Sequence, residues 1–169
     1  MKNLLHFLTT SLFLLPFSIL IAQPLAGSYT IGGTSPDYSS VNDAISALNM
    51  NGVSGQVTFN IRDGVYNETF TIGQVMGTSD MNHIVFQSES MDATSVTIQE
   101  KSDGSNPLWI MDTASYITFY ELTFKNNDTL AYDLFEMYGS NNDISWLGCH
   151  FTSNATIDDY ALYLEPDTA

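Results

Sequence analysis

The chain has 169 residues, and 19 Asp and Glu residues against four Lys and Arg give it a formal net charge of −15 at pH 7. Such acidity excludes nucleic acid or an anionic membrane surface as a partner, because every phosphate contact would begin with repulsion. A hydrophobic content of 44% is ample for a packed core and excludes wholesale disorder.

Residues 1–22 have the pattern of a secretory signal peptide. Lys2 supplies a positive start, Leu4 to Ile21 is almost wholly apolar, and Ala22 offers a small residue for cleavage. An uncleaved membrane anchor is the alternative, because the apolar run is nearly long enough to span a bilayer. Pro16 favours a cleaved signal. We therefore expect a secreted or cell-surface protein that has no membrane contact once the signal is removed.

Residues 23–55 are expected to form an N-terminal lead-in and one amphipathic helix. Apolar residues recur three or four positions apart and so share one helix face: Tyr38, Val41, Ile45 and Leu48. Ser40 with Asp43 approximates a capping box, and Asn51-Gly52 supplies a left-handed stop. We expect this helix to cover the N-terminal edge of whatever sheet follows.

A strand and a glycine turn come next. Val57, Phe59 and Ile61 alternate with polar residues, which is the periodicity of a strand. The segment after them contains Gly64-Val65-Tyr66-Asn67-Glu68. A helix of this type that leads through a strand into Gly-x-Tyr-x-Glu resembles the opening of secreted bacterial proteins of the pectin lyase-like superfamily. The resemblance implies an all-β fold, a right-handed parallel β-helix (solenoid) with an N-terminal capping α-helix, and a scaffold role for Gly64 to Glu68.

The second half of the chain repeats with a period of about 27 residues. Three sets of apolar pairs align. In the first set, Trp109 and Met111 align with Phe135 and Met137, and these with Leu162 and Leu164. In the second, Ile117 and Phe119 align with Ile144 and Trp146, and in the third, Leu122 and Phe124 align with Cys149 and Phe151. Within each unit the apolar alternation breaks phase by one residue, which indicates a corner between two short strands. Stacked coils of this kind form parallel sheets.

The earlier part of residues 56–169 fits the same plan more loosely. Further strand cores are predicted at Phe70 and Ile72, at Ile84 and Phe86, and at Val96 and Ile98. An antiparallel β-sandwich is the alternative, since it also uses short alternating strands. The conserved size and phase of the repeated side chains favour parallel coils. Because no capping element follows the last predicted strand, we expect the coils to continue beyond residue 169 in a longer protein.

The repeat register predicts which side chains face the core. Phe119, Leu122, Trp146, Cys149 and Phe151 are expected to be nearly inaccessible. Cys149 is then a small buried hydrophobe rather than a reactive thiol. The outward side chains expected at the surface are Thr118, Ser145 and His150.

Enzymes of the pectin lyase-like superfamily include pectate lyases, pectin methylesterases and polygalacturonases, whose sites lie on outward surfaces of the coils. The resemblance therefore invites an enzyme, but no outward column here stacks two acids, and Arg62 is the only arginine. No catalytic residues can be assigned. Acidic turns at Asn126 to Asp128, Asn141 to Asp143 and Asp158-Asp159 leave Ca²⁺ binding open, although Asn and Asp also simply shape turns.

Two outward aromatic residues, Tyr120 and Tyr163, are the candidate glycan contacts. His83 precedes a predicted strand and has no companion at metal-ligand spacing. His150 has no acidic partner in its column and is expected to be a solvated surface histidine. We expect a non-catalytic extracellular scaffold that acts in adhesion or glycan binding and has a polysaccharide or cell-surface partner. The alternative is the N-terminal part of a polysaccharide lyase or a pectinesterase-like enzyme whose active site lies outside this segment.

Overall fold

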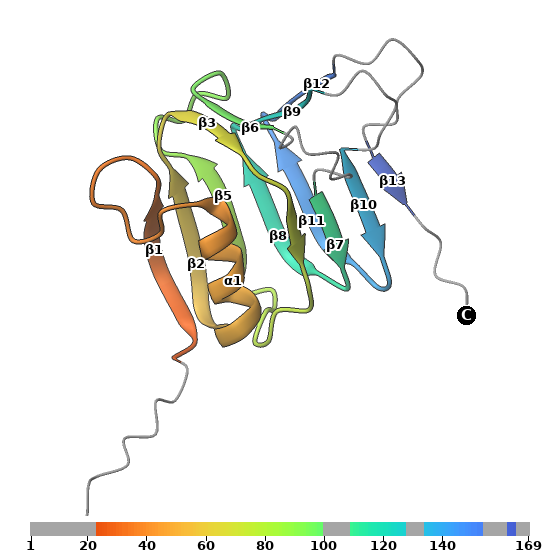
Figure 1. Ribbon diagram of the computed structural model, residues 1–169. Helices are drawn as coiled ribbons and strands as arrows, with labels where there is room; N and C mark the ends of the chain where they lie inside the picture. The colour runs from red at the N-terminus through yellow and green to blue at the C-terminus, as the bar shows by residue number, and fades with distance from the viewer. Residues whose placement is uncertain (1–22, 100–108, 128–133, 154–161, 165–169) are drawn as a thin grey trace, which may run out of the picture.

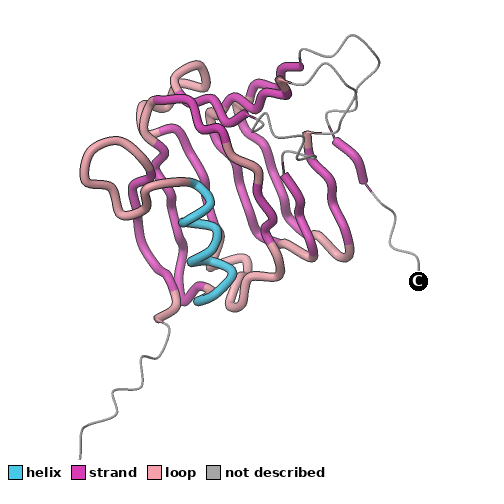
Figure 2. The backbone as a smooth tube through the Cα atoms, viewed as in Figure 1, coloured by secondary structure: helices cyan, strands magenta, loops and turns pink. Residues whose placement is uncertain are grey.

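The computed structural model describes residues 23–99, 109–127, 134–153 and 162–164. Its strands form three sheets (Figures 1 and 2). Sheet A runs in the order β1 (Leu25–Ile31), β2 (Val53–Ile61), β5 (Ile84–Ser88), β8 (Ser115–Tyr120) and β11 (Asn142–Leu147). Sheet B contains β3 (Gly64–Asn67), β6 (Val96–Gln99), β9 (Thr123–Asn126) and β12 (His150–Ser153). Sheet C contains β4 (Phe70–Ile72), β7 (Trp109–Asp112), β10 (Phe135–Tyr138) and β13 (Leu162–Leu164).

Every pairing between these strands is parallel, and each joins one coil to the next. β2–β3–β4 form the first complete coil, and β5–β6–β7, β8–β9–β10 and β11–β12–β13 form three more. The described part of the chain is thus an all-β parallel β-solenoid of four coils with one short helix near its N-terminal end. The prediction of a parallel β-helix is confirmed, and the antiparallel sandwich is excluded.

The repeat register is also confirmed. Ile117 pairs with Ile144, Phe124 with Phe151, and Phe135 with both Trp109 and Leu162. Because the sheets are parallel and in register, apolar side chains of similar size stack from coil to coil. The side chains that face inward in sheet A form one aromatic column: Tyr29, Phe59, Phe86, Phe119 and Trp146. Neighbouring ring centroids in this column are 4.9 to 5.9 Å apart.

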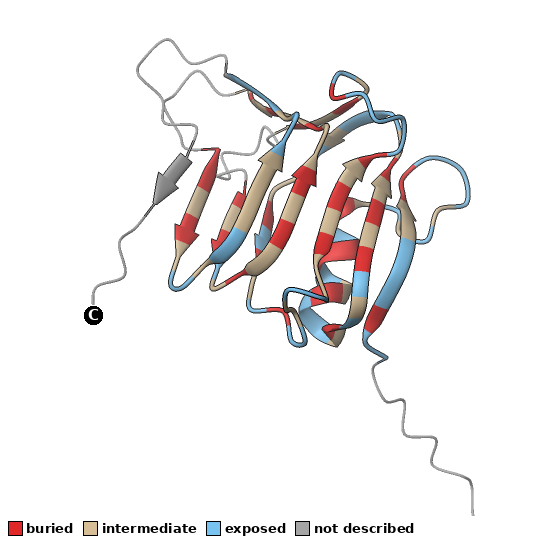
Figure 3. Cartoon of the chain, turned by 180° about the vertical axis from the view of Figure 1, so that it is seen from behind, coloured by how far each residue is buried: buried red, intermediate tan, exposed pale blue. Residues whose placement is uncertain are grey.

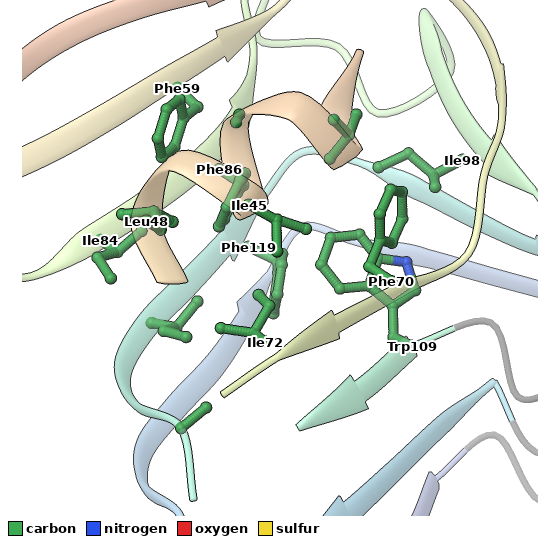
Figure 4. Close-up of a cluster of buried hydrophobic side chains, with 14 of the residues drawn as sticks. Ile45, Leu48, Phe59, Phe70, Ile72, Ile84, Phe86, Ile98, Trp109 and Phe119 are labelled. Atoms are coloured by element: carbon green, nitrogen blue, oxygen red, sulfur yellow. The ribbon is translucent and has the colours of Figure 1, made fainter. Parts of the chain in front are cut away.

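The one helix among the described residues, α1 (Val41–Asn51), closes the N-terminal end of the core. Its Ser40 side chain accepts a hydrogen bond from the Asp43 N–H at 3.0 Å, and the Gly52 N–H bonds the Leu48 carbonyl at 2.8 Å with Gly52 at a φ of 68°. Val41, Ala44, Ile45 and Leu48 are buried. Figure 4 shows the helix lying over the same apolar cluster as Phe59 and Trp109.

Helix α1 packs against β4, the first strand of sheet C, and also contacts β1 and β2 of sheet A. The Asn49 side-chain amide donates to the Thr71 carbonyl at 3.1 Å and accepts from the Gly73 N–H at 3.2 Å. These two bonds replace a neighbouring strand along the open edge of β4. The expectation that the helix covers an N-terminal edge is correct for sheet C. The edge of sheet A is instead formed by β1, a strand that the sequence patterns did not predict.

The last complete coil is less buried than its register suggested. Phe119 and Leu122 are fully buried, but Phe151 is 41% exposed, and Trp146 and Cys149 are only partly buried. The Phe151 ring nevertheless stacks inward on Phe124 at 5.7 Å. Its direction was therefore predicted correctly and its burial was not, because β12 is an edge strand of sheet B in the described part of the chain and has a neighbouring strand on one side only.

The outward positions show a second difference. His150 is exposed as expected, but Thr118 and Ser145 are half-buried, and their hydroxyls hydrogen-bond each other at 3.0 Å. Adjacent strands in register bring outward side chains close enough to shield one another. The Cys149 thiol has a raised pKa because of its burial, in agreement with a packing role. The predicted signal peptide, residues 1–22, lies outside the described residues.

Candidate functional site

The segment Gly64 to Glu68 builds the N-terminal end of the solenoid. The Tyr66 hydroxyl lies 2.8 Å from the Arg62 carbonyl and 3.3 Å from the Ile31 carbonyl. Gly32 sits directly against this hydroxyl at a φ of 74°, and a Cβ there would collide with it. Burial raises the pKa of Tyr66, and the nearby Glu68 charge adds to the rise. Tyr66 is therefore a neutral packing residue that joins the loop after β1 to the first coil.

Glu68 completes the same construction. Its carboxylate accepts hydrogen bonds from the backbone N–H groups of Val41 at 3.3 Å and Asn42 at 2.9 Å. These groups belong to the first turn of α1, where backbone donors lack partners within the helix and the helix dipole favours negative charge. The role of Glu68 is to fix the helix to β3. This agrees with the scaffold role that the resemblance implied.

Arg62 holds the loop that follows β1. Its Nη1 donates to the carbonyls of Gly32 at 3.1 Å and Thr34 at 2.6 Å, and its Nε lies 3.5 Å from the Glu89 carboxylate. A cavity of about 620 Å³ beside these groups is lined by Asp63 and Glu68 among others. The only arginine of the chain is thus engaged in structural contacts at this end of the solenoid.

The acidic turns do not gather into a metal centre within the part of the chain that the structure describes. Asp143 instead lies 3.3 Å from the His83 Nε2. Asp128, Asp158 and Asp159 lie outside the described residues, so the Ca²⁺ hypothesis for those turns stays a prediction.

Figure 3 views the outer face of sheet A. We define this sheet A face by ten side chains that alternate with the buried ones at the paired positions of the five strands: Ser28, Thr30, Thr58, Asn60, Val85, Gln87, Thr118, Tyr120, Ser145 and Leu147. None of these ten is charged, in a chain with a net charge of −15. Asp143, near the start of β11, is the one charged residue within the five strands. The face is therefore an uncharged strip with one carboxylate at its edge.

Hydrogen bonds run across this face from coil to coil. The Gln87 Nε2 donates to the Asn60 Oδ1 at 2.8 Å, and Thr118 and Ser145 share the hydroxyl bond described above. Parallel strands lie about 4.8 Å apart, so polar groups recur at that spacing along the solenoid. Such a face can offer a regular series of hydroxyl and amide groups to an extended ligand.

The two tyrosines predicted as glycan contacts lie on different sheets. Tyr120 is half-buried at the end of β8, on the sheet A face, in register with Gln87 and Leu147. The backbone of Tyr163 lies in β13 of sheet C, where it pairs with Glu136. The structure therefore does not assemble the two into one aromatic site, and it places only Tyr120 on the uncharged face.

A second cavity, of about 680 Å³, borders the same sheet at the turns that lead from sheet C into sheet A. Three residues stand side by side next to this cavity: His83, Tyr116 and Asp143. Each immediately precedes an isoleucine, and the three isoleucines pair with one another across sheet A. The His83 and Tyr116 rings meet edge to face at 5.4 Å. The sequence analysis found no companion for His83 at metal-ligand spacing, although its alignment one and two coils later with Tyr116 and Asp143 could have found this group.

Comparisons with known proteins add little to this geometry. No family model matches the chain, and no curated protein matches it. Among solved structures, it is similar to pectin methylesterase from Aspergillus niger in a deglycosylated form, with 15% identity and a TM-score of 0.40. A penultimately deglycosylated form of that enzyme is similar with 16% identity and a TM-score of 0.41. Each match covers 86% of this chain and 64% of the enzyme chain. The fold assignment rests on the strand pairing.

The described residues contain no helix that is both long and apolar enough to cross a membrane.

Proposed function

We propose that this chain is a secreted, non-catalytic scaffold module that contacts an extracellular glycan through the sheet A face. The supporting observation is the absence of charge from that face in so acidic a chain. Uncharged hydroxyl and amide groups can exchange hydrogen bonds with sugar hydroxyls without repelling them. Repeated coils give an extended surface, which suits a polymer better than a single small molecule.

The geometry argues against a catalytic role for the described segment. Cleavage of a uronic acid chain by elimination needs a base and a cation that stabilises the carboxylate-bearing intermediate. Arg62, the only arginine, is bound to the carbonyls of Gly32 and Thr34. The net charge of −15 also repels a polyuronate. A lyase or pectinesterase-like enzyme with its site outside this segment is the alternative function.

A binding screen tests the proposal. The purified protein is presented to neutral and acidic polysaccharides, and binding is followed by calorimetry for the wild type, Gln87→Ala and Met50→Ala. Met50 is 78% exposed on α1 and is not part of the sheet A face, so it serves as the control. Gln87→Ala should weaken binding by roughly two- to tenfold, the equivalent of one or two hydrogen bonds. Equal affinities for all three proteins would show that the sheet A face does not take part in binding.

The enzyme alternative has its own assay. Pectin and polygalacturonate are incubated with the protein, with and without Ca²⁺, and methanol release and unsaturated products are measured. We expect neither product. Reproducible turnover that Arg62→Ala abolishes would make the enzyme the leading interpretation.

A further inference from the structure

The cavity of about 680 Å³ at the border of sheet A has the size and lining of a small-molecule site. Binding pockets usually span about 300–1,000 Å³ and combine apolar surface with a few polar groups. Here Val75, Met76 and Tyr116 supply the apolar part, and Gln74 and Asn142 are among the polar residues. No lining residue carries a charge. The turns that enclose the cavity come from three successive coils and lie along the lower rim of Figure 1.

Polar groups in this lining are available to a ligand. Within the described part of the chain, the side-chain amides of Gln74 and Asn142 and the Tyr116 hydroxyl form no hydrogen bond. Tyr116 has a φ of 61°, in the left-handed region that bulky side chains rarely adopt. The fold thus holds an aromatic ring at the cavity in an unfavourable backbone conformation, and such outliers concentrate at binding sites.

Charged groups beside the cavity are paired with each other or with neighbours. The Asp143 carboxylate lies 3.3 Å from the His83 Nε2, and the Asp112 carboxylate accepts a hydrogen bond from the Thr113 hydroxyl at 3.2 Å. The His83 ring also packs edge-on against Tyr116. His83 and Asp143 therefore support the Tyr116 ring from the side of sheet A and leave the cavity itself uncharged.

We propose that this cavity binds a neutral saccharide, with Tyr116 as the ring against which a sugar packs and with Gln74 and Asn142 as hydrogen-bonding groups. An uncharged ligand is favoured because the lining offers no cation to an acidic sugar, and the two flanking carboxylates would repel one. The proposal rests on the proposed glycan-binding function and refines it. It names the ligand class and a site at the edge of the sheet A face.

Nuclear magnetic resonance titration of the whole protein tests this site. The probes are cellohexaose, xylohexaose and mannohexaose as neutral oligosaccharides, and hexagalacturonate as the acidic one. Tyr116→Asn removes the ring, and asparagine tolerates the left-handed conformation better than other non-glycine residues. Gln74→Ala, at an exposed position, is a second variant that does not threaten folding, and Met50→Ala is the control.

We expect a neutral probe to shift the amide signals of Gly77, Ser115 and Asn142, and Tyr116→Asn to weaken its binding by about tenfold. Gln74→Ala should weaken binding by a smaller factor, and Met50→Ala should leave it unchanged. In one outcome, Gln87→Ala weakens binding of a neutral probe, whereas Tyr116→Asn and Gln74→Ala do not. This result would overturn the cavity as the site and leave the proposed function standing. Binding of hexagalacturonate at the cavity, without binding of the neutral probes, would overturn the proposed ligand class. Binding of no probe to the wild type would overturn both proposals.

Discussion

Individual aromatic residues carry much of the core. Phe119 is fully buried, stacks on Phe86 at 5.6 Å and on Trp146 at 5.9 Å, and meets Trp109 edge to face at 4.9 Å. Offset stacked and edge-to-face arrangements of this kind add to the gain from burial alone. Phe151 occupies an equivalent inward direction in sheet B but keeps 41% of its surface exposed. The same residue type therefore contributes differently to the free energy of unfolding in neighbouring coils.

This difference predicts the outcome of two alanine substitutions. Phe119→Ala should lower the free energy of unfolding by about 3–5 kcal/mol, because a fully buried ring leaves a cavity. Phe151→Ala should cost less than half as much, since its ring is partly in water already. Urea denaturation followed by tryptophan fluorescence measures both. Equal losses would mean that Phe151 is buried in solution by a part of the chain that the structure does not describe.

At the scale of elements, the exposed edge of strand β1 is protected by the loop that follows it. The Asp37 carboxylate accepts hydrogen bonds from the Thr30 N–H at 2.7 Å and from the Thr30 hydroxyl at 2.8 Å. The Tyr38 N–H then bonds the Thr30 carbonyl at 3.0 Å. An open strand edge is a template for aggregation, and a charged residue placed on it is a common protection. This loop is also the one that Arg62 holds.

Removing the Asp37 carboxylate should open this edge. Asp37→Ala is expected to speed hydrogen exchange of the Thr30 amide and to increase light scattering at high protein concentration. Asp80→Ala, which removes another exposed carboxylate, should change neither. If the Thr30 amide exchanges as slowly in Asp37→Ala as in the wild type, the loop protects the edge without this carboxylate.

The same contact has a predictable pH dependence. The backbone N–H of Thr30, and then its hydroxyl, lower the pKa of Asp37 below 3.8 in the folded protein. A group with a depressed folded pKa stabilises the fold above its unfolded pKa, and that contribution is lost as the pH falls through the folded pKa. The Thr30 amide signal should therefore stay constant between pH 7 and pH 5 and move only below pH 3.8. A transition near pH 6 would point to a different group.

For the whole molecule, the dominant electrostatic fact is the excess of 19 acidic over four basic residues. Self-repulsion of this size destabilises a compact state. The fold offsets part of it by giving some carboxylates structural partners, as Glu68 has at the start of α1. The remaining repulsion is long-range, so it should respond to dissolved salt.

Raising NaCl from about 10 mM to about 100 mM should increase the urea midpoint, because the Debye length shrinks from about 30 Å to about 10 Å. Sucrose in place of salt serves as the uncharged control for general solvent effects. CaCl₂ and MgCl₂ at equal ionic strength should act alike. Stabilisation by Ca²⁺ alone at low concentration would contradict this and would place an ion at the Asn- and Asp-rich turns.

The sequence by itself determined the coils. Alternation of apolar residues, a phase break at each corner and a repeat of about 27 residues are local patterns, and parallel pairing of Ile117 with Ile144 follows from them. The helix was equally readable, since Ser40 and Gly52 at its two ends act through bonds within a few residues. The scaffold role of Gly64 to Glu68 came from the resemblance to known β-helix proteins.

Only the tertiary structure decided how these coils meet. Asn49 completes the edge of β4 and Asp37 closes the edge of β1, although neither contact follows from the strand pattern or the repeat. The repeat aligns His83 with Asp143, but only the stacked coils show that the two side chains meet at 3.3 Å. The 41% exposure of Phe151 likewise could not be obtained from its inward direction. The physical reason is that strand periodicity fixes the direction of a side chain, whereas its partners and exposure depend on chain segments brought together by stacking.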